Sequence, residues 1–241
     1  MQSRQTNRPT VRSMGLPSEM PDKRAAADLT LEELRVLLVP AVADNAAFDG
    51  WSDLAIDAAA KERGVDPVVA RLAFPGGAMD MIGAWVGTVD TAMARALPAE
   101  TLAELPIRER IRRLVQFRLD AVAGREEALR RALAIFAMPQ NALASLRLGW
   151  KSADLMWRLA GDQATDYNHY TKRTILAAIY AATLAVFIGD ESDGKEETRA
   201  FLGRRIDGVI RFEKAKARML PPAEERFSVA RFLGRLRYPA R

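Results

Sequence analysis

Apolar residues recur at helical spacing along most of the chain, and this pattern is the strongest constraint on its fold. In the first such segment Leu34, Leu38 and Val42 lie four residues apart, which places them on one face of a helix. Thr30 followed by Glu33 is typical of a capping box at the start of that helix. No segment shows the period-two alternation of a half-buried β-strand. The sequence therefore predicts an all-α fold.

Start and stop signals divide the chain into about nine helices. Gly64 is expected to end one helix, Pro67 to begin the next, and Gly76 with Gly77 to break the chain again. The predicted helices cover about 31–45, 52–63, 67–74, 79–97, 107–122, 126–138, a helix beginning at 139, 167–188 and 195–220. Before them, residues 1–27 are predicted to form a disordered tail, because prolines and a glycine interrupt any amphipathic pattern. The alternative is an organelle transit peptide, since the first 18 residues hold three arginines and no acid.

Composition excludes several classes of function. The 241 residues include no cysteine, which removes disulfides and thiolate metal sites, and the single histidine, His169, cannot build a centre that needs two imidazoles. The chain has no GxSxG nucleophile elbow, no GxGxxG motif and no phosphate-binding loop. Asp166-x-x-His169 is one copy of an element that a di-iron bundle needs twice. We therefore predict a protein that is not an enzyme and has neither a metal site nor a cofactor.

Residues 51–85 resemble the helix-turn-helix of tetracycline-repressor-like regulators. The short helix at 67–73 would enter the major groove, and it offers only Arg71 as a basic side chain. Residues 49–80 carry three basic and six acidic side chains, so a nucleic acid is repelled. We expect a vestigial helix-turn-helix over residues 48–85 and no nucleic-acid partner. The alternative is a transcriptional regulator of this class that senses a lipid.

Positive charge is concentrated at the C-terminus. The chain has a net charge of +5, with −3 on residues 1–198 and +8 on residues 199–241. An apolar stripe flanked by arginines is typical of a helix at a membrane surface. The sequence therefore predicts an amphipathic membrane-binding helix over residues 223–238, with packing against its own domain as the alternative. The residues concerned are Arg226, Val229, Arg231, Phe232, Leu233, Arg235, Leu236 and Arg237.

Polar and aromatic residues alternate at the start of the apolar stretch that follows Trp157. Tyr167, His169 and Tyr170 cannot all face the core of a helix, because successive positions are about 100° apart. Some of them should be exposed, and exposed aromatic side chains often anchor interfaces. The uncharged run 174–189 has 16 residues, whereas a membrane span needs about 20, so we interpret it as a buried core helix.

The run MWRLAGDQATDYNHYTKRTILAAIYAATLAVFIGD, with MPQN at 138–141 and FDGW at 48–51, closely resembles the lipid-binding accessory proteins of ubiquinone biosynthesis. The resemblance implies a tetracycline-repressor-like all-helical lipid-binding domain over residues 28–220. It also implies an isoprenoid quinone ligand, and the di-iron demethoxyubiquinone hydroxylase as partner. His169 stands where the family has tryptophan. The residues expected to dock the partner are Asp162, Gln163, Asp166, Tyr167, Asn168, His169, Tyr170 and Arg173.

The same resemblance implies an interior lipid pocket. Its lining residues are expected on apolar helix faces, which could equally form solid core. Methionine would suit a pocket that adapts to its ligand. The resemblance also implies a peripheral membrane protein that contacts an anionic surface, at the cytoplasmic face of a bacterial inner membrane or, alternatively, at the mitochondrial matrix face. A homodimer remains an open alternative. The expected lining residues are Leu114, Phe117, Leu143, Met156, Ile175 and Ile179.

Overall fold

The computed structural model describes residues 28–162 and 167–219, without the side chains of Tyr167, Asn168 and residues 213–219. The predicted tail (1–27), Gln163, Asp166 and the predicted membrane helix (223–238) lie outside the described residues. Within them the regular elements are all helical, which confirms the all-α prediction. The ten α-helices are α1 (Leu31–Asp49), α2 (Asp53–Arg63), α3 (Pro67–Leu72), α4 (Gly77–Ala96), α5 (Ala99–Leu102), α6 (Ile107–Val122), α7 (Glu126–Phe136), α8 (Ala142–Leu159), α9 (Tyr167–Phe187) and α10 (Glu196–Met219).

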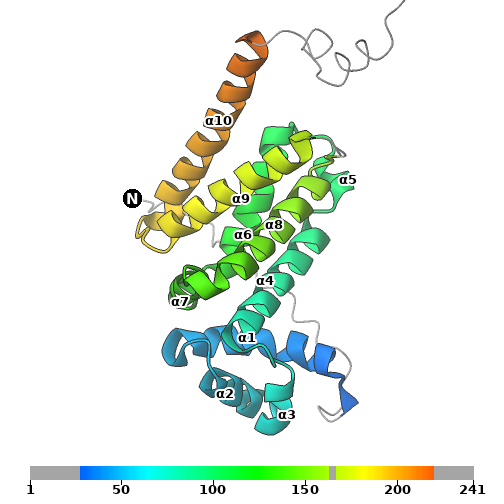
Figure 1. Ribbon diagram of the computed structural model, residues 1–241, viewed down its shortest axis with the longest axis vertical. Helices are drawn as coiled ribbons and strands as arrows, with labels where there is room; N and C mark the ends of the chain where they lie inside the picture. The colour runs from blue at the N-terminus through cyan, green and yellow to red at the C-terminus, as the bar shows by residue number, and fades with distance from the viewer. Residues whose placement is uncertain (1–27, 163–166, 220–241) are drawn as a thin grey trace, which may run out of the picture.

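Helices α1, α2 and α3 form a small unit at one end of the molecule (Figure 1). Their ends follow local signals. At the start of α1 the amide of Glu33 donates to Thr30 Oγ1 at 3.3 Å, and the amide of Thr30 donates to the Glu33 carboxylate at 2.9 Å. The side chain of Asp66 accepts from the amide of Val68 at 2.7 Å and caps α3. Gly64 ends α2, as predicted, and it does so in the left-handed conformation.

The turn between α1 and α2 is anchored by Trp51. Its indole packs against Trp85 of α4 with ring centroids 5.3 Å apart, and its Nε1 donates to the carbonyl of Ala128 in α7 at 3.0 Å. Both indoles are buried. One turn of chain therefore joins the α1–α3 unit to two helices of the larger bundle, because the amphipathic indole supplies apolar contact and a hydrogen bond together.

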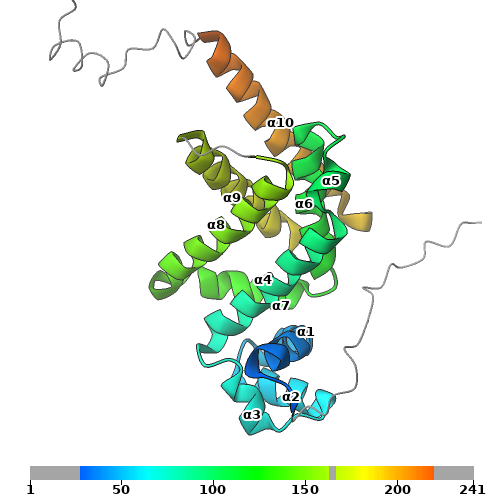
Figure 2. The same ribbon diagram turned by 90° about the vertical axis from the view of Figure 1, so that its right-hand side faces the viewer.

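Helix α4 leads from the α1–α3 unit into the larger bundle, in which α8 and α9 form a hairpin and α10 packs on α9 and α6 (Figures 1 and 2). Leu114, Leu119 and Met156 lie fully buried at the centre of this bundle. The helices are held in register by their apolar faces, as expected for amphipathic helices.

An ion pair lies inside the bundle. Arg118 of α6 pairs with Asp90 of α4, and the hydroxyl of Ser152 in α8 donates to the same carboxylate at 3.0 Å. The guanidinium lies over the ring of Tyr180 in α9, 4.8 Å from its centroid. Four helices thus meet around one charged pair, and breaking such a pair leaves a buried charge without its partner.

Two element boundaries differ from the sequence-based expectation. Helix α1 continues through Pro40 to Asp49 instead of ending near residue 45, and Gly50 ends it with a positive φ of 71°. A four-residue helix, α5, occupies a segment for which we predicted none, because the turn after Pro98 closes onto α8. Among the residues that the structure describes, no helix is both long and apolar enough to cross a membrane.

Candidate functional site

The candidate site lies on the hairpin of α8 and α9. Before α8, the motif at 138–141 forms a short 3₁₀ turn, Pro139–Asn141, and the Asn141 side-chain amide donates to the carbonyl of Ile135 at 2.9 Å. At the other end of α8 the chain turns through Gly161, whose φ of 87° favours glycine. These two turns fix where α8 starts and where the chain leaves it toward α9.

The buried side chain of Arg173 in α9 forms an ion pair with α8. Its Nε donates to Asp154 Oδ1 of α8 at 2.6 Å, and its terminal nitrogen donates to Asp162 Oδ2 and to the carbonyl of His169, each at 3.1 Å. The side chain is only 2% exposed. A guanidinium suits this role, because its planar set of donors can bind two carboxylates and a carbonyl together. Asp154 also pairs with Arg158 at 2.6 Å.

Lys172 adds a second cation at Asp162. Its ammonium donates to Asp162 Oδ1 at 2.6 Å and lies 5.4 Å from the ring centroid of Trp157. The Trp157 Nε1 in turn donates to the carbonyl of Lys172 at 3.0 Å. Burial by itself raises the pKa of Asp162, but the hydrogen bonds from Lys172 and Arg173 outweigh it and lower the pKa. Asp162 is therefore a carboxylate at neutral pH.

Three aromatic side chains gather on the outer side of this hairpin. The ring of Trp150 in α8 lies 5.8 Å from Tyr170 and 6.3 Å from His169, and His169 lies 5.2 Å from Tyr170 in an edge-on arrangement. Tyr170 is 61% exposed, while Trp150 and His169 are partly exposed. We call Trp150, His169 and Tyr170 the aromatic cluster. Such a cluster offers large contact area with little side-chain entropy to lose on binding.

The predicted docking residues fall into two groups. Asp162, His169, Tyr170 and Arg173 come together at the start of α9. Arg173 differs from the expectation of a surface residue, because its charge is satisfied inside the hairpin and its side chain is buried. Arg173 therefore positions Asp162 and the first turn of α9 and is not itself available at the surface. Gln163, Asp166 and the side chains of Tyr167 and Asn168 lie outside the described residues.

Sequence reasoning missed four residues of this site. Asp154, Trp157 and Lys172 belong to the ion-pair network, and Trp150 belongs to the aromatic cluster. The spacing of 150, 154 and 157 places the three α8 residues on one face of a helix, which is a signal in the sequence. That this face meets the start of α9 follows only from the fold.

The residues expected to line a lipid pocket are divided between core and surface. Leu114 and Met156 are fully buried in the bundle, and Phe117 and Ile179 are partly buried and pack against its core. Ile175 is partly buried, and Leu143 lies 60% exposed on α8. Neither of the two cavities described next is lined by any of these six side chains.

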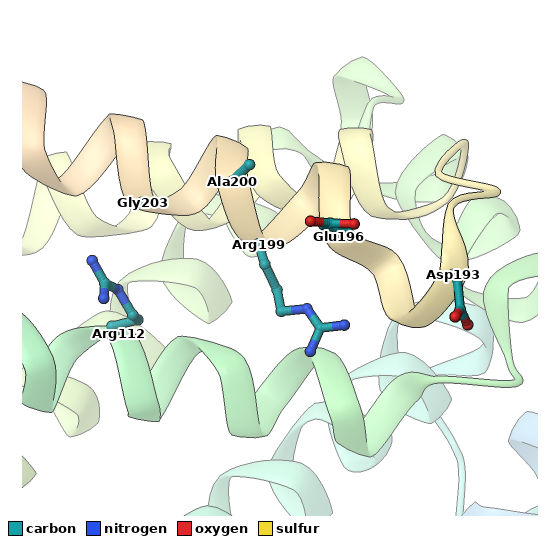
Figure 3. Close-up of a pocket in the computed structure, with 6 residues that line it drawn as sticks. All are labelled: Arg112, Asp193, Glu196, Arg199, Ala200 and Gly203. Carbon is teal, nitrogen blue, oxygen red and sulfur yellow. The ribbon is translucent and has the colours of Figure 1, made fainter.

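Two cavities lie elsewhere. One, of about 540 Å³, lies between α6 and α10, and Figure 3 shows Arg112 and Arg199 reaching into the space between these helices. Side chains of both charge signs line it, which does not suit an apolar chain. The other, of about 440 Å³, lies between α4 and α8. The first is lined by Arg112, Asp193, Glu196, Arg199, Ala200 and Gly203, and the second by Gly87, Asp90, Thr91, Ala94, Arg95, Lys151, Leu155 and Arg158.

The arrangement of helices defines the class of protein. The crystal structure of the TetR transcriptional regulator from Nitrosomonas europaea ATCC 19718 matches this structure with a TM-score of 0.59, covering 72% of this chain and 96% of that chain at 22% sequence identity. The protein therefore has the tetracycline-repressor (TetR) fold, as the sequence predicted. At this level of identity the likeness concerns the fold alone.

The sequence comparisons narrow the class to a family. Residues 142–213, which contain the hairpin and most of α10, match the model of the COQ9 family. The chain is 35% identical over 187 residues to "Ubiquinone biosynthesis protein COQ9, mitochondrial" of Homo sapiens and 34% identical to the protein of that name from Rattus norvegicus. The chain belongs to the COQ9 family of ubiquinone biosynthesis proteins. The aligned part covers 74% of this chain and under two thirds of these relatives, 58% and 59% of their length.

Proposed function

We propose that this protein is a non-catalytic, lipid-binding accessory protein of ubiquinone biosynthesis. In this role it binds isoprenoid quinone intermediates at a membrane surface and presents them to the di-iron demethoxyubiquinone hydroxylase. One observation carries the proposal: the exposed aromatic cluster rests on the buried Arg173 network, inside the segment that matches the family. Family membership supports a role in ubiquinone biosynthesis. The geometry of the hairpin supports a docking surface for a protein partner.

The hairpin has the properties of a preorganised docking surface. Binding hot spots combine large aromatic side chains with a rigid setting, because groups already in place lose little entropy on association. Here Arg173 binds Asp154 and Asp162 and thereby holds the first turns of α9 in place. The backbone that carries Tyr170 is therefore fixed. Lys172, two residues after Tyr170, pairs with Asp162 and so also holds this first part of α9 in place.

Replacement of the most exposed member of the cluster tests the docking part of the proposal. Tyr170→Ala is expected to weaken association with the hydroxylase by about 2 kcal/mol or more, a factor of about 30, as for other interface hot spots. Phe48→Ala is the matched control, because Phe48 is also an exposed aromatic residue but lies at the end of α1. Titration calorimetry with the purified hydroxylase measures both. Equal affinities for Tyr170→Ala and the unmodified protein would exclude this docking site.

For the lipid, we propose that apolar residues of α8 and α9 make the first contacts. Leu143 and Leu146 are 60% and 72% exposed on α8, while Ile175 and Ile179 lie partly buried on α9. Leu114 and Met156 fill the core beneath them, so the lipid reaches these two only when the hairpin moves away from α6. An exposed leucine surface stabilises an apolar ligand by roughly 25 cal/mol for each Å² that it removes from water.

Mass spectrometry of the native protein tests the lipid part. An isoprenoid quinone or a precursor is expected to co-purify with the unmodified protein, and the double variant Leu143→Ser/Leu146→Ser is expected to carry less of it. Val68→Ser/Leu72→Ser provides the control, because these two residues are as exposed but lie on α3. Protein that carries no prenylated lipid when purified from a host that makes ubiquinone would contradict the proposal.

The membrane part of the proposal concerns residues outside the described ones. We propose that residues 223–238 lie at an anionic membrane surface, on the cytoplasmic face of a bacterial inner membrane, and the charge of +8 on residues 199–241 supports this. Flotation with anionic liposomes is expected to require residues 223–241. If truncated and full-length chains float equally, this segment is not the membrane anchor.

A DNA-binding role receives less support from the geometry. The only basic side chain on α3 is Arg71, and it is held by two hydrogen bonds from its guanidinium to Asp57 of α2. The remaining outward side chains of α3 include Val68 and Leu72, which offer no donors to base edges or phosphates. We propose that this unit does not bind DNA. A gel-shift assay with genomic fragments at low salt is expected to show no complex.

A further inference from the structure

The α1–α3 unit exposes apolar side chains where a DNA-binding relative of the fold would need polar ones. Val68 and Leu72 of α3 are 68% and 59% exposed, Val69 lies beside them, and Leu54 is exposed on α2. We call Leu54, Val68, Val69 and Leu72 the α2–α3 face. The Asp57–Arg71 pair joins α2 to α3, and Leu54 precedes Asp57 by one turn while Leu72 follows Arg71 in the sequence. Such a cluster on a small unit is a candidate interaction surface.

The unit that carries this face has a net negative charge, to which residues 28–49 contribute most, because residues 53–72 carry four acidic and three basic side chains. Residues 28–80, which form α1–α3 and the first turn of α4, carry ten acidic and four basic side chains. Two of the four cations are already held by acidic partners, Arg71 by Asp57 and Arg35 by Asp80. The occupant of the α2–α3 face should therefore be cationic and carry apolar side chains. A second copy of the same face and an anionic membrane are both disfavoured by repulsion.

Residues 1–27 have the required chemistry. They carry five basic side chains and two acidic ones, and the first 18 residues contain three arginines and no acid. Apolar side chains lie between the arginines, with Val11, Met14 and Leu16 close to Arg12 in the sequence. By contrast, α10, which precedes the strongly basic segment at the other terminus, ends at the opposite end of the molecule from α1–α3 (Figure 1).

Residues 1–27 also join the fold beside this face. The side chain of Arg35, in the second turn of α1, donates to the carbonyl of Ala73 at 2.8 Å, and Ala73 directly follows Leu72. The start of α1 thus lies against the end of α3. An extended chain spans about 3.3 Å per residue, so 27 residues reach every part of the face. A tether this short gives an effective concentration of about a millimolar, at which a weak contact is populated.

We propose that the N-terminal segment, residues 1–27, docks on the α2–α3 face of its own chain. Its arginines pair with carboxylates of the α1–α3 unit, and Val11, Met14 and Leu16 cover Val68 and Leu72. The face that a DNA-binding protein of this fold uses for nucleic acid is then an internal docking surface. This inference is independent of the proposed lipid carrier function.

A spin label in the full chain tests the proposal. The chain has no cysteine, so Ser13→Cys gives a single site for a nitroxide. Electron paramagnetic resonance is expected to show an immobilised component, which Val68→Ser/Leu72→Ser should abolish. Leu143→Ser/Leu146→Ser, on exposed leucines of α8, is the matched control and should leave it unchanged. Exchange of Arg4, Arg8 and Arg12 for glutamate should also abolish it, without any change to the folded helices.

Each other outcome overturns the proposal. A fully mobile label in the parent protein means that the segment does not dock. An immobilised component that persists in both the α3 variant and the arginine variant means that it docks elsewhere. A component that disappears on dilution of the protein means that the face receives the segment of a second copy. Circular dichroism confirms that the variants keep their helices, and the arginine variant decides the matter if the α3 variant does not fold.

Discussion

The α1–α3 unit and the α8–α9 hairpin both expose apolar side chains, yet different interactions hold them in shape. In the α1–α3 unit the helix ends are set by near neighbours in the sequence, such as Thr30 with Glu33 and the left-handed Gly64. In the hairpin, α8 has no side-chain cap on its first amides, and Arg173 instead joins Asp154 to Asp162 across two helices. Local hydrogen bonds set the helix ends of the first region, and a buried charge network joins the helices of the second.

This difference bears on what each surface can do. A network that converges on one buried guanidinium fixes the backbone beneath Tyr170, and a fixed backbone is what a high-affinity docking site needs. The α2–α3 face rests on small buried residues such as Ala59, Ala60 and Ala70, and its ion pair is exposed. The same apolar character therefore supports a partner surface on the hairpin and a weaker, tethered contact on α2–α3.

The largest effect is expected from removing the buried cation. Arg173→Met leaves Asp154 and Asp162 without their shared partner, and breaking a buried pair costs about 3–5 kcal/mol. Urea unfolding at pH 7 measures the loss in free energy of unfolding. Arg71→Met, in the exposed pair of the α1–α3 unit, is the control and should change stability far less. Comparable losses in the two variants would remove the distinction between the regions.

Acid should weaken the ion-pair network of the hairpin. The pKa of Asp162 is lowered in the folded protein, so its contribution to stability is complete above the unfolded value and is lost as pH falls through the folded value. Below about pH 4 the intrinsic tryptophan fluorescence, to which Trp150 and Trp157 of α8 contribute, is expected to change as the hairpin opens. Asp162→Asn should flatten this dependence. Asp57→Asn should leave it unchanged, and a parallel response of both variants would argue against a hairpin-specific effect.

A moderate effect is expected at the turn that ends α2. Gly64 has a φ of 66°, and no other heavy atom would lie within 4 Å of an added Cβ, so Gly64→Ala acts on the backbone alone and should cost about 1–2 kcal/mol. Gly83 in α4 also has open space around it but lies within a helix. Gly83→Ala should therefore stabilise the protein, by about 0.4–1 kcal/mol. Thermal unfolding distinguishes the two signs, and a Gly64→Ala variant as stable as the unmodified protein would show that the left-handed turn does not require glycine.

The smallest effect is expected at the residue that caps α1. Thr30→Ala removes the capping box and should cost about 1 kcal/mol. Hydrogen exchange should increase in the first turn of α1 and remain unchanged in α8 and α9. Thr30→Ser restores the capping oxygen and should recover most of the loss. If the amide hydrogens of α8 exchange faster in Thr30→Ala, the α1–α3 unit and the hairpin are energetically coupled. That result would contradict the view that different interactions stabilise them independently.

The candidate site was predictable in part. The polar and aromatic pattern at the start of residues 157–188 indicated a docking surface, and some of Tyr167, His169 and Tyr170 were expected to be exposed; Tyr170 is exposed. The burial of Arg173 was not predictable, because an arginine near the start of a helix is usually exposed. Here Asp154 and Asp162 neutralise its charge, and this contact is visible only in the folded chain. Trp150 was missed for a similar reason, because its contact with Tyr170 connects two helices.

The sequence by itself determined the helical class, most helix ends and the family, because each depends on periodicity, capping residues or motifs that are local along the chain. Only the tertiary structure decided that Leu114 and Met156 are packed core, that Leu143 is exposed and that Arg173 is buried. Burial depends on which helix covers which face. Which face is covered depends on packing between segments far apart in the sequence, so a local sequence pattern does not predict it.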